Sequence, residues 1–224
     1  MTGTKPETLF VRQLQLGSMK NFVYLFGAPH GDEAVVVDPA WDVPAIFEAL
    51  ASANRQLVGV FLTHHHHDHI NGVPEVLARR DVPVFVQSAE AEFGADPLKP
   101  FADALRVVSP SERVKIAGAE ISCLHTPGHT PGSQCLSCGG AVFTGDTLFV
   151  NACGRCDFQG GDARQMHDSL FNVLGALDGS TTVYAGHDYG DVKVSSLERE
   201  RSQNPYFQLR DVNDFVRFRM RPRT

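Results

Sequence analysis

Five histidines and one aspartate follow directly after an apolar run in the first half of the chain. The run at residues 57–62 is predicted to be a buried strand, and it continues into Thr63-His-His-His-His-Asp-His69. Imidazole and carboxylate groups are ligands that zinc and iron accept, whereas neutral imidazoles gain nothing from crowding without a cation. A purification tag or a solvated histidine-rich loop would explain the run differently, but tags lie at chain ends and lack the Asp-His ending. The stretch therefore predicts a metal site at a strand end, where α/β sheets bind ligands.

The bulk composition is that of an ordinary globular protein and disfavours several classes of function. The chain has 224 residues, of which 42% are hydrophobic and 21% charged, so we expect one domain with a sizeable core. A net charge of −6 argues against a nucleic-acid binder. No apolar run approaches the roughly 20 residues of a membrane span. Residues 1–7 are polar and lack the apolar segment of a signal peptide, so we expect a cytoplasmic location.

The cysteines are predicted to be reduced thiols. There are five of them, an odd number, in a chain without an export signal. The pairs Cys135/Cys138 and Cys153/Cys156 approximate a four-cysteine zinc template. However, Cys135 and Cys138 lie on a predicted strand, where positions three apart point to opposite faces. This spacing disfavours a four-cysteine zinc site and leaves the role of the two pairs open.

The remaining pattern alternates strands and helices in each half of the chain. Strands are predicted at residues 9–16, 21–26, 33–37, 57–62, 82–86, 113–116, 120–125, 134–137, 141–144 and 182–184. Helices are predicted after Asp42, at residues 74–80, 88–93, 161–177 and 212–220, and after Ser195, which has capping-box spacing to Glu198. Residues 94–110 contain three prolines and are predicted to be a long surface connection. Two sheets between layers of helices would bury these elements.

Three further predicted strands end in a glycine or proline turn that carries one histidine or aspartate. The residues are His129, Asp146 and His187. A lone histidine after a strand is usually a packed or capped residue. Four such loops in one chain change this expectation, because the ends of parallel strands meet at one edge of a sheet. Within the histidine run, His64 and His66 can share one cation since alternate residues of an extended segment face the same way. Asp68 and His69 can reach a second cation if the chain turns near Asp68, and the two spacer histidines are expected to face outward.

The combined motifs resemble the metallo-β-lactamase superfamily and, within it, the glyoxalase II-like (hydroxyacylglutathione hydrolase-like) group. The matching stretches are residues 63–69, 127–132, 145–149, 153–155 and 186–189, and the resemblance runs from about Asn21 to Asn204. It implies an α/β fold, namely an αβ/βα four-layer sandwich of two mixed β-sheets flanked by helices. It also implies a single domain over residues 1–224, with a short basic helical extension from about residue 193.

The resemblance also implies the role of each site residue. It places His64, His66 and His129 on one metal, Asp68, His69 and His187 on the other, and Asp146 between the two metals. Asp38 matches a carboxylate that orients a ligand histidine, in keeping with the usual second hydrogen bond of ligating imidazoles. Asp146 stands where true β-lactamases of this fold carry a cysteine, which disfavours antibiotic hydrolysis. Arg155 could meet an anionic substrate group or form an ordinary loop salt bridge.

Two enzymatic reactions fit this ligand set. The first is a glyoxalase II-like thioester hydrolase with two divalent metal ions, zinc foremost and iron or manganese as alternatives. A metal-bridging hydroxide would attack the thioester carbonyl, and Asp68 could orient this nucleophile. The second is a glutathione persulfide dioxygenase-like enzyme with a single iron on His64, His129 and Asp146, a facial triad. Residues 153–159 and 194–205 resemble that family too, and a non-enzymatic metal-dependent scaffold is disfavoured by the intact ligand set.

We expect a small-molecule thioester or thiol conjugate as the substrate, and neither a nucleic acid nor a membrane as a partner. The sequence leaves a homodimer open. Basic residues outnumber acidic ones in the last segment, namely Lys193, Arg199, Arg201, Arg210, Arg217, Arg219, Arg221 and Arg223. They could steer an anionic thiol conjugate to the site, but a solvated basic tail is the favoured interpretation.

Overall fold

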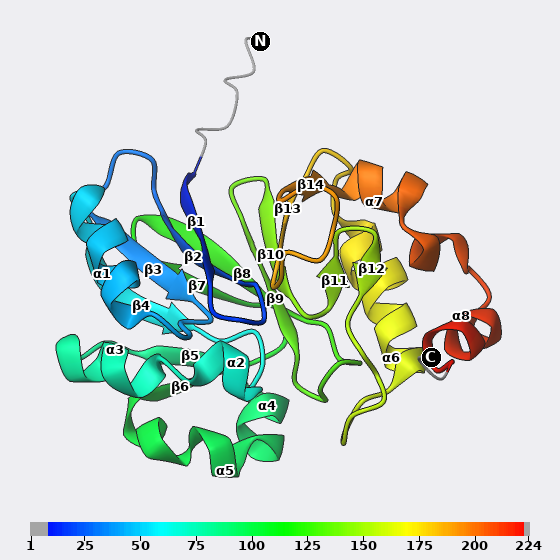
Figure 1. Cartoon of the computed structure of the whole chain (residues 1–224), viewed down its shortest axis with the longest axis horizontal. Helices are drawn as coiled ribbons and strands as arrows, with labels where there is room; N and C mark the ends of the chain where they lie inside the picture. Colours follow the sequence, from blue (N-terminus) through cyan, green and yellow to red (C-terminus); the bar gives the residue numbers. More distant parts are fainter. Residues whose placement is uncertain (1–8, 222–224) are drawn as a thin grey trace, which may run out of the picture.

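Two six-stranded mixed β-sheets lie face to face in the computed structural model, which describes residues 9–221 (Figure 1). The first sheet has the order β1 (Phe10–Leu16), β2 (Asn21–Gly27), β3 (Glu33–Val37), β4 (Gln56–Phe61), β5 (Val84–Gln87) and β6 (Leu105–Val108). The second has the order β14 (Ser195–Ser196), β13 (Thr182–Ala185), β10 (Ala141–Gly145), β9 (Gln134–Cys138), β8 (Ala119–His125) and β7 (Glu112–Ile116). Strands β3 to β6 pair in parallel, as do β10 and β13, and the other neighbours are antiparallel.

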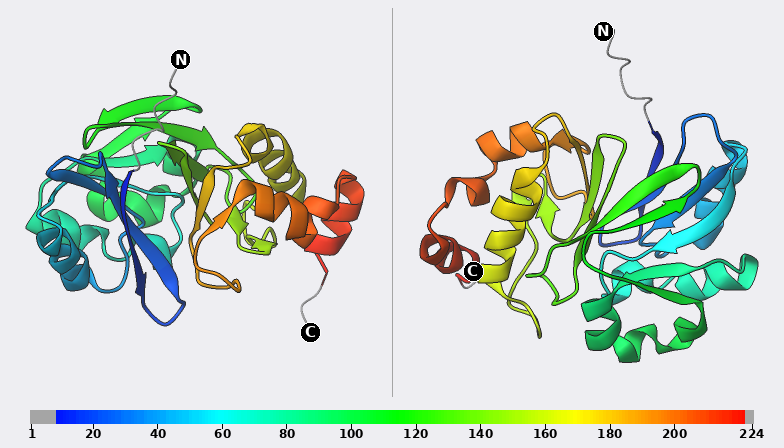
Figure 2. Two further views of the ribbon diagram at one scale, coloured as in Figure 1. Left: turned by 90° about the horizontal axis from the view of Figure 1, so that it is seen from above. Right: turned by 180° about the vertical axis from the view of Figure 1, so that it is seen from behind.

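Helices cover the outer side of each sheet (Figure 2). The first sheet carries α1 (Val43–Ser52), α2 (His67–Ile70), α3 (Val73–Arg79), α4 (Ser88–Phe93), α5 (Ala95–Leu98) and η1 (Lys99–Ala104). The second carries α6 (Ala163–Asp168), η2 (Ser169–Val173), η3 (Leu174–Ala176), α7 (Leu197–Gln203), η4 (Pro205–Gln208) and α8 (Val212–Arg219). A small ribbon of β11 (Leu148–Phe149) and β12 (Ala152–Cys153) lies beside the second sheet. Within residues 9–221, no helix is both long and apolar enough to cross a membrane.

Three apolar cores separate these four layers, and strand β2 shows how the sequence specifies them. Every residue of β2 is buried, and alternate side chains point to opposite faces. Val23 and Leu25 pack toward α1 and α3 in the first core, whereas Phe22, Tyr24 and Phe26 pack between the sheets in the second. The third core lies between the second sheet and the last helices. This αβ/βα sandwich confirms the predicted fold class.

The structure differs from the sequence-based expectation at residues 94–110 and near Ser195, and it adds the short strands β11, β12 and β14. Residues 94–110 were expected to be a surface connection, but they contain α5, η1 and the edge strand β6. These elements have only four to six residues each, which is too short for a helical or strand period to be recognised. The helix predicted after Ser195 is capped by Ser196, whose hydroxyl accepts a hydrogen bond from Arg199 N at 3.2 Å. Ser195 instead donates to the buried Glu200.

The contact between the two sheets depends on a cluster of stacked aromatic rings. The ring of Phe143 stacks on Phe26 with centroids 4.4 Å apart and on Tyr184 at 5.1 Å. We expect Phe143→Ala to lower the free energy of unfolding by about 3–5 kcal/mol, because it leaves a cavity between the sheets. Urea unfolding measures the change. Val107→Thr at an exposed β6 position is the control and should stay within about 0.5 kcal/mol; an equal loss in both variants would contradict this account of the core.

Candidate metal centre

Four loops bring the predicted ligand residues together at one edge of the sandwich. His64 and His66 follow β4, and Asp68 and His69 lie on the short helix α2 that comes next. His129 follows β8, Asp146 follows β10 and His187 follows β13. A cavity of about 610 Å³ opens here and is lined by His66, Asp68, His129, Asp146 and His187 among other residues. His64 and His69 lie just behind its wall and are each 1% exposed.

Close approach of the two halves requires a glycine beside Asp146. Gly145 has φ +47°, and a Cβ atom at this position would lie 2.4 Å from the Thr63 hydroxyl oxygen. No larger residue fits such a contact without moving the backbone. The Asp146 side chain therefore starts at the point where the second half meets the histidine run.

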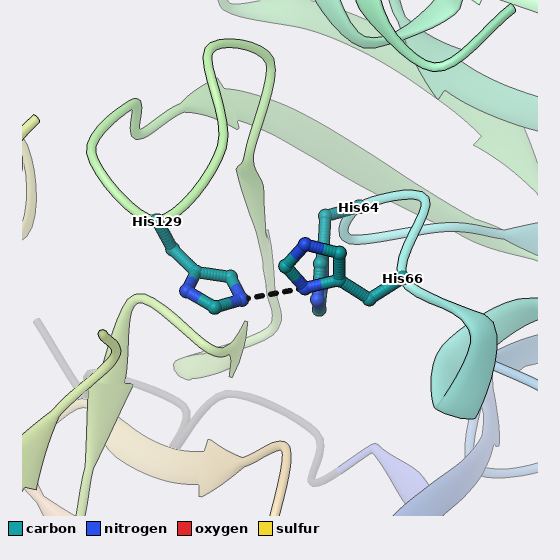
Figure 3. A group of neighbouring side chains, drawn as sticks. All are labelled: His64, His66 and His129. Atoms are coloured by element: carbon teal, nitrogen blue, oxygen red, sulfur yellow. Dashed lines mark hydrogen bonds between the residues drawn. The ribbon is translucent and has the colours of Figure 1, made fainter. Parts of the chain in front are cut away.

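The first donor group consists of three imidazoles whose nitrogen atoms converge (Figure 3). One ring nitrogen each of His64, His66 and His129 lies within 4.8 Å of the others. His129 Nε2 is 2.9 Å from His66 Nδ1, and His64 Nε2 is buried without a hydrogen-bond partner. Since a buried polar atom without a partner is costly, this geometry fits a cation at the centre of the three nitrogens.

Hydrogen bonds at the far side of the His64 and His129 rings determine which nitrogen faces the centre. His129 Nδ1 donates to the Arg155 carbonyl oxygen at 2.7 Å. The Thr63 hydroxyl donates its hydrogen to Asp38. Toward His64 Nδ1, which lies 3.0 Å away, its oxygen can therefore act only as an acceptor. Each of these rings therefore carries hydrogen on Nδ1 and turns the lone pair of Nε2 toward the centre.

The second donor group comprises Asp68, His69 and His187. His69 Nδ1 donates to Asp38 Oδ2 at 2.9 Å, and His187 Nδ1 donates to the Met19 carbonyl oxygen at 2.9 Å. Both Nε2 atoms then present lone pairs, and they face each other at 3.2 Å. Two facing lone pairs at this distance need a proton or a metal cation between them.

Asp146 contacts both groups through different oxygens. Its Oδ1 atom lies 3.3 Å from the Nε2 atoms of both His69 and His187, and its Oδ2 atom lies 3.5 Å from His129 Nε2. The buried Oδ1 atom has no hydrogen-bond partner. The carboxylate is thus placed as a shared ligand would be, and the donors fit two metal ions.

The electrostatic environment favours the ligating forms of His64, His66, His129 and Asp146, and His69 is the exception. Burial lowers the pKa of His64 and His129, and it lowers the pKa of His66 to about 4. Burial alone would raise the pKa of Asp146, but neighbouring histidines, above all His69, hold it well below its usual value. Burial also opposes charge on His69, yet the carboxylates of Asp146 and Asp38 raise its pKa overall. A metal ion that binds at His69 would therefore compete with a proton for its Nε2 atom.

Sequence reasoning missed Glu90, which ties the two halves of the site together. This fully buried carboxylate on α4 accepts hydrogen bonds from His65 N at 2.7 Å, from Thr130 Oγ1 at 2.7 Å and from Gly132 N at 3.0 Å. It also binds the ring of His65, which is therefore directed away from the donors. This spacer histidine was expected to face outward, but its side chain is mostly buried. His67, the other spacer, is exposed, but it lines the cavity of the site. A buried glutamate on a short helix leaves no signal in the sequence pattern.

Asn21 and Trp41 were also missed, and both act on Asp68. Asn21 is 2% exposed, and its Nδ2 atom donates to Asp68 O at 2.9 Å and to Asp68 Oδ2 at 3.0 Å. The Trp41 indole N–H donates to Asn21 Oδ1 at 2.8 Å, which orients the amide. The only sequence signal was that Trp41 is the single tryptophan of the chain and lies close to Asp38.

Several other expectations can be placed in the structure. Arg155 lines the cavity, but its guanidinium binds the Asp157 carboxylate through two hydrogen bonds of 2.8 and 2.7 Å. All five cysteines are buried, and within residues 9–221 no donor group includes a cysteine. Basic residues of the last segment bind elsewhere, as Arg199 to Asp191 and Arg219 to the Gly154 carbonyl oxygen. Arg223 lies outside the described residues.

Comparison with known proteins identifies the family of this chain. The family model described as the metallo-beta-lactamase superfamily matches residues 17–187. The probable polyketide biosynthesis zinc-dependent hydrolase PksB of Bacillus subtilis (strain 168) is 31% identical over 201 residues, 90% of this chain and 88% of that protein. A hydroxyacylglutathione hydrolase of Alkalilimnicola ehrlichii is 37% identical over 186 residues, 83% of this chain and 68% of that protein. The crystal structure of ETHE1 from Myxococcus xanthus superposes with a TM-score of 0.85 at 32% identity, covering 96% of this chain and 92% of that one.

Asp38 supports both donor groups, so its replacement should weaken metal binding at both. Asp38→Asn keeps the size of the side chain, and asparagine tolerates the positive φ of 50° at this position. However, the amide cannot accept all three hydrogen bonds. We expect metal affinity to fall about 10–100-fold, measured by competition with a chelator. Asp32→Asn, at an exposed turn, is the matched control and should bind metal as the parent protein does; unchanged affinity in Asp38→Asn would refute the orienting role.

Proposed function

The chain belongs to the metallo-beta-lactamase superfamily, and from this membership we propose that it is a dinuclear metal-dependent hydrolase that cleaves a thioester. The observation that carries the proposal is the intact second donor group and its connection to the first through Asp146. The first group alone would suffice for one metal. The Nε2 atoms of His69 and His187, turned toward each other by hydrogen bonds at both Nδ1 atoms, support a second metal ion beside Asp68.

We assign the ligands by the atoms that face the centre of each group. The first metal would bind His64 Nε2, His66 Nδ1 and His129 Nε2, the second would bind Asp68 Oδ2, His69 Nε2 and His187 Nε2, and Asp146 would bind both. Zinc is the first choice, because a relative of this chain is described as a zinc-dependent hydrolase. The same nitrogen and oxygen donors accept iron and manganese.

The overall reaction consumes one water molecule. The thioester C–S bond breaks and a C–O bond forms, which yields a carboxylate, a thiol and one proton. Two bound metal ions would lower the pKa of water toward ~7 and polarise the thioester carbonyl. Asp68 lies at the cavity, and Asn21 binds its Oδ2 atom, which leaves Oδ1 to accept a hydrogen bond from the attacking water. Asp68 would thereby orient the nucleophile, and the leaving sulfur would take up a proton from solvent.

A persulfide dioxygenase with one iron is the second candidate. The observation in its favour is the similarity to ETHE1 over nearly the whole of both chains. His64, His129 and Asp146 would form the facial triad. In that case the second donor group would hold no metal, and reaction of a thiol persulfide would consume oxygen.

Metal analysis together with two assays separates the candidates. We expect two metal ions per chain, cleavage of a thioester and no oxygen uptake with glutathione persulfide. One iron per chain with oxygen uptake would replace the hydrolase by the dioxygenase. Asp146→Ala is the control for contaminating activities, because it removes the proposed shared ligand and should abolish whichever reaction the protein catalyses.

Asn21 distinguishes the two proposed metal positions. Asn21→Ala removes the amide that holds Asp68 and leaves the Trp41 N–H without its acceptor. Because Asn21 does not touch the three histidines of the first group, we expect the second metal to bind about 10-fold more weakly while the first keeps its affinity. Stepwise titration of the metal-free protein with zinc measures both. Equal weakening of both steps would show that Asn21 acts on the fold as a whole.

A further inference from the structure

Large side chains with apolar or aromatic surface contribute to the walls of the cavity. They are Met19, Phe149, Phe158, Tyr189 and Tyr206. Met19, Phe158 and Tyr189 are 45%, 42% and 53% exposed, which places them among the most exposed large apolar residues in the described part of the chain. Exposed apolar side chains that gather around a concave site are typical of a binding surface for an apolar ligand.

These rings stand on both sides of the donor residues. Phe158 lies on the side of the first donor group, with its ring centroid 5.4 Å from His66 and 6.0 Å from His129. Tyr189 stacks on His187 of the second group at 4.7 Å, and Phe149 lies 5.4 Å from Tyr189. A carbonyl group bound between the donor groups would therefore have aromatic surface on either side.

Charged groups that could recognise an ionic substrate are scarce in the same cavity. Asp68 and Asp146 are its acidic residues, and both belong to the donor groups. Arg155 is the only lysine or arginine among the lining residues, and Asp157 already binds its guanidinium through two hydrogen bonds. The guanidinium also lies over the Phe158 ring at 4.1 Å, which holds it against the wall.

Glutathione conjugates carry two carboxylates and one ammonium group at the two ends of the peptide arm that bears the sulfur. Each charge that leaves water needs a partner of opposite sign. For a glutathione carboxylate, the attraction of Arg155 is reduced, because the Asp157 carboxylate already balances its charge. An uncharged amide arm, of the kind found in pantetheine, makes no such demand.

We propose that the substrate is a thioester with an apolar acyl group on a thiol arm that is uncharged near its sulfur, and not a glutathione conjugate. The apolar walls bind the acyl chain, and the donor groups bind the thioester carbonyl between them. This inference rests on the proposed thioester hydrolase function and names its substrate class.

A binding comparison tests the inference independently of catalysis. Four stable thioethers separate the two parts of the substrate: S-hexyl and S-methyl derivatives of N-acetylcysteamine and of glutathione. Calorimetry with the metal-loaded protein gives each Kd. We expect each hexyl compound to bind at least 10-fold more tightly than its methyl counterpart. S-hexyl-N-acetylcysteamine should bind within threefold of S-hexylglutathione or more tightly, and a more than threefold preference for the glutathione compound would overturn the inference.

Hydrolysis of matched thioesters then separates failure of the inference from failure of the proposed function. Hexanoyl-N-acetylcysteamine should be cleaved with a higher kcat/KM than S-hexanoylglutathione. If the glutathione ester is the better substrate, the substrate class is wrong and the hydrolase function stands. If the metal-loaded protein cleaves neither ester, the proposed function fails, together with the inference that rests on it.

Variants of the wall connect binding to the named residues. Phe158→Ala and Tyr189→Ala should each weaken binding of S-hexyl-N-acetylcysteamine about 3–10-fold and leave the S-methyl compound nearly unchanged. The zinc content of each variant is measured alongside, since both rings lie near donor histidines. Met220→Ala, at an apolar position 45% exposed and outside the cavity, is the control. Equal loss for hexyl and methyl compounds would show that the walls do not bind the acyl chain.

Discussion

Three hydrogen bonds to one buried carboxylate hold both donor groups in place. Asp38 Oδ1 accepts from Thr63 N at 2.7 Å, and Oδ2 accepts from Thr63 Oγ1 at 2.6 Å and from His69 Nδ1 at 2.9 Å. Because an ionised carboxylate only accepts, His69 must carry hydrogen on Nδ1, and the threonine hydroxyl imposes the same tautomer on His64. One residue therefore turns an Nε2 lone pair of each group toward the centre of the site.

Such a concentration of lone pairs is unfavourable by itself, and the surrounding fold stabilises it. His69 and Asp38 are buried beneath the first core, and Glu90 connects the histidine loop to the loop that carries His129. The two sheets meet through stacked aromatic rings that bring Gly145 against Thr63. The site thus uses the stability of the sandwich to hold groups that would separate in a flexible chain, a common feature of functional sites.

The fold class and the family could be predicted from the sequence, since long apolar strands and strand-end motifs leave a clear pattern. The histidine run, His129, Asp146 and His187 were recognised as potential ligands because each follows a strand directly. Short elements such as β6 and α5 could not be recognised, because four residues do not display a period. Glu90 and Asn21 were also beyond reach, because a buried polar residue that supports a ligand is identified only by the atoms around it.

The sequence by itself determined the chemistry of the donors and their order along the chain, because residue types and strand-end positions are local properties. Only the tertiary structure decided which nitrogen of each ring faces the centre, and that aromatic side chains and one arginine paired with Asp157 line the cavity around them. These features depend on contacts between residues far apart in the chain, such as His69 and His187, which are 118 positions apart. Distances of 3 Å between such residues are set by the packing of the two sheets, and no local pattern records them.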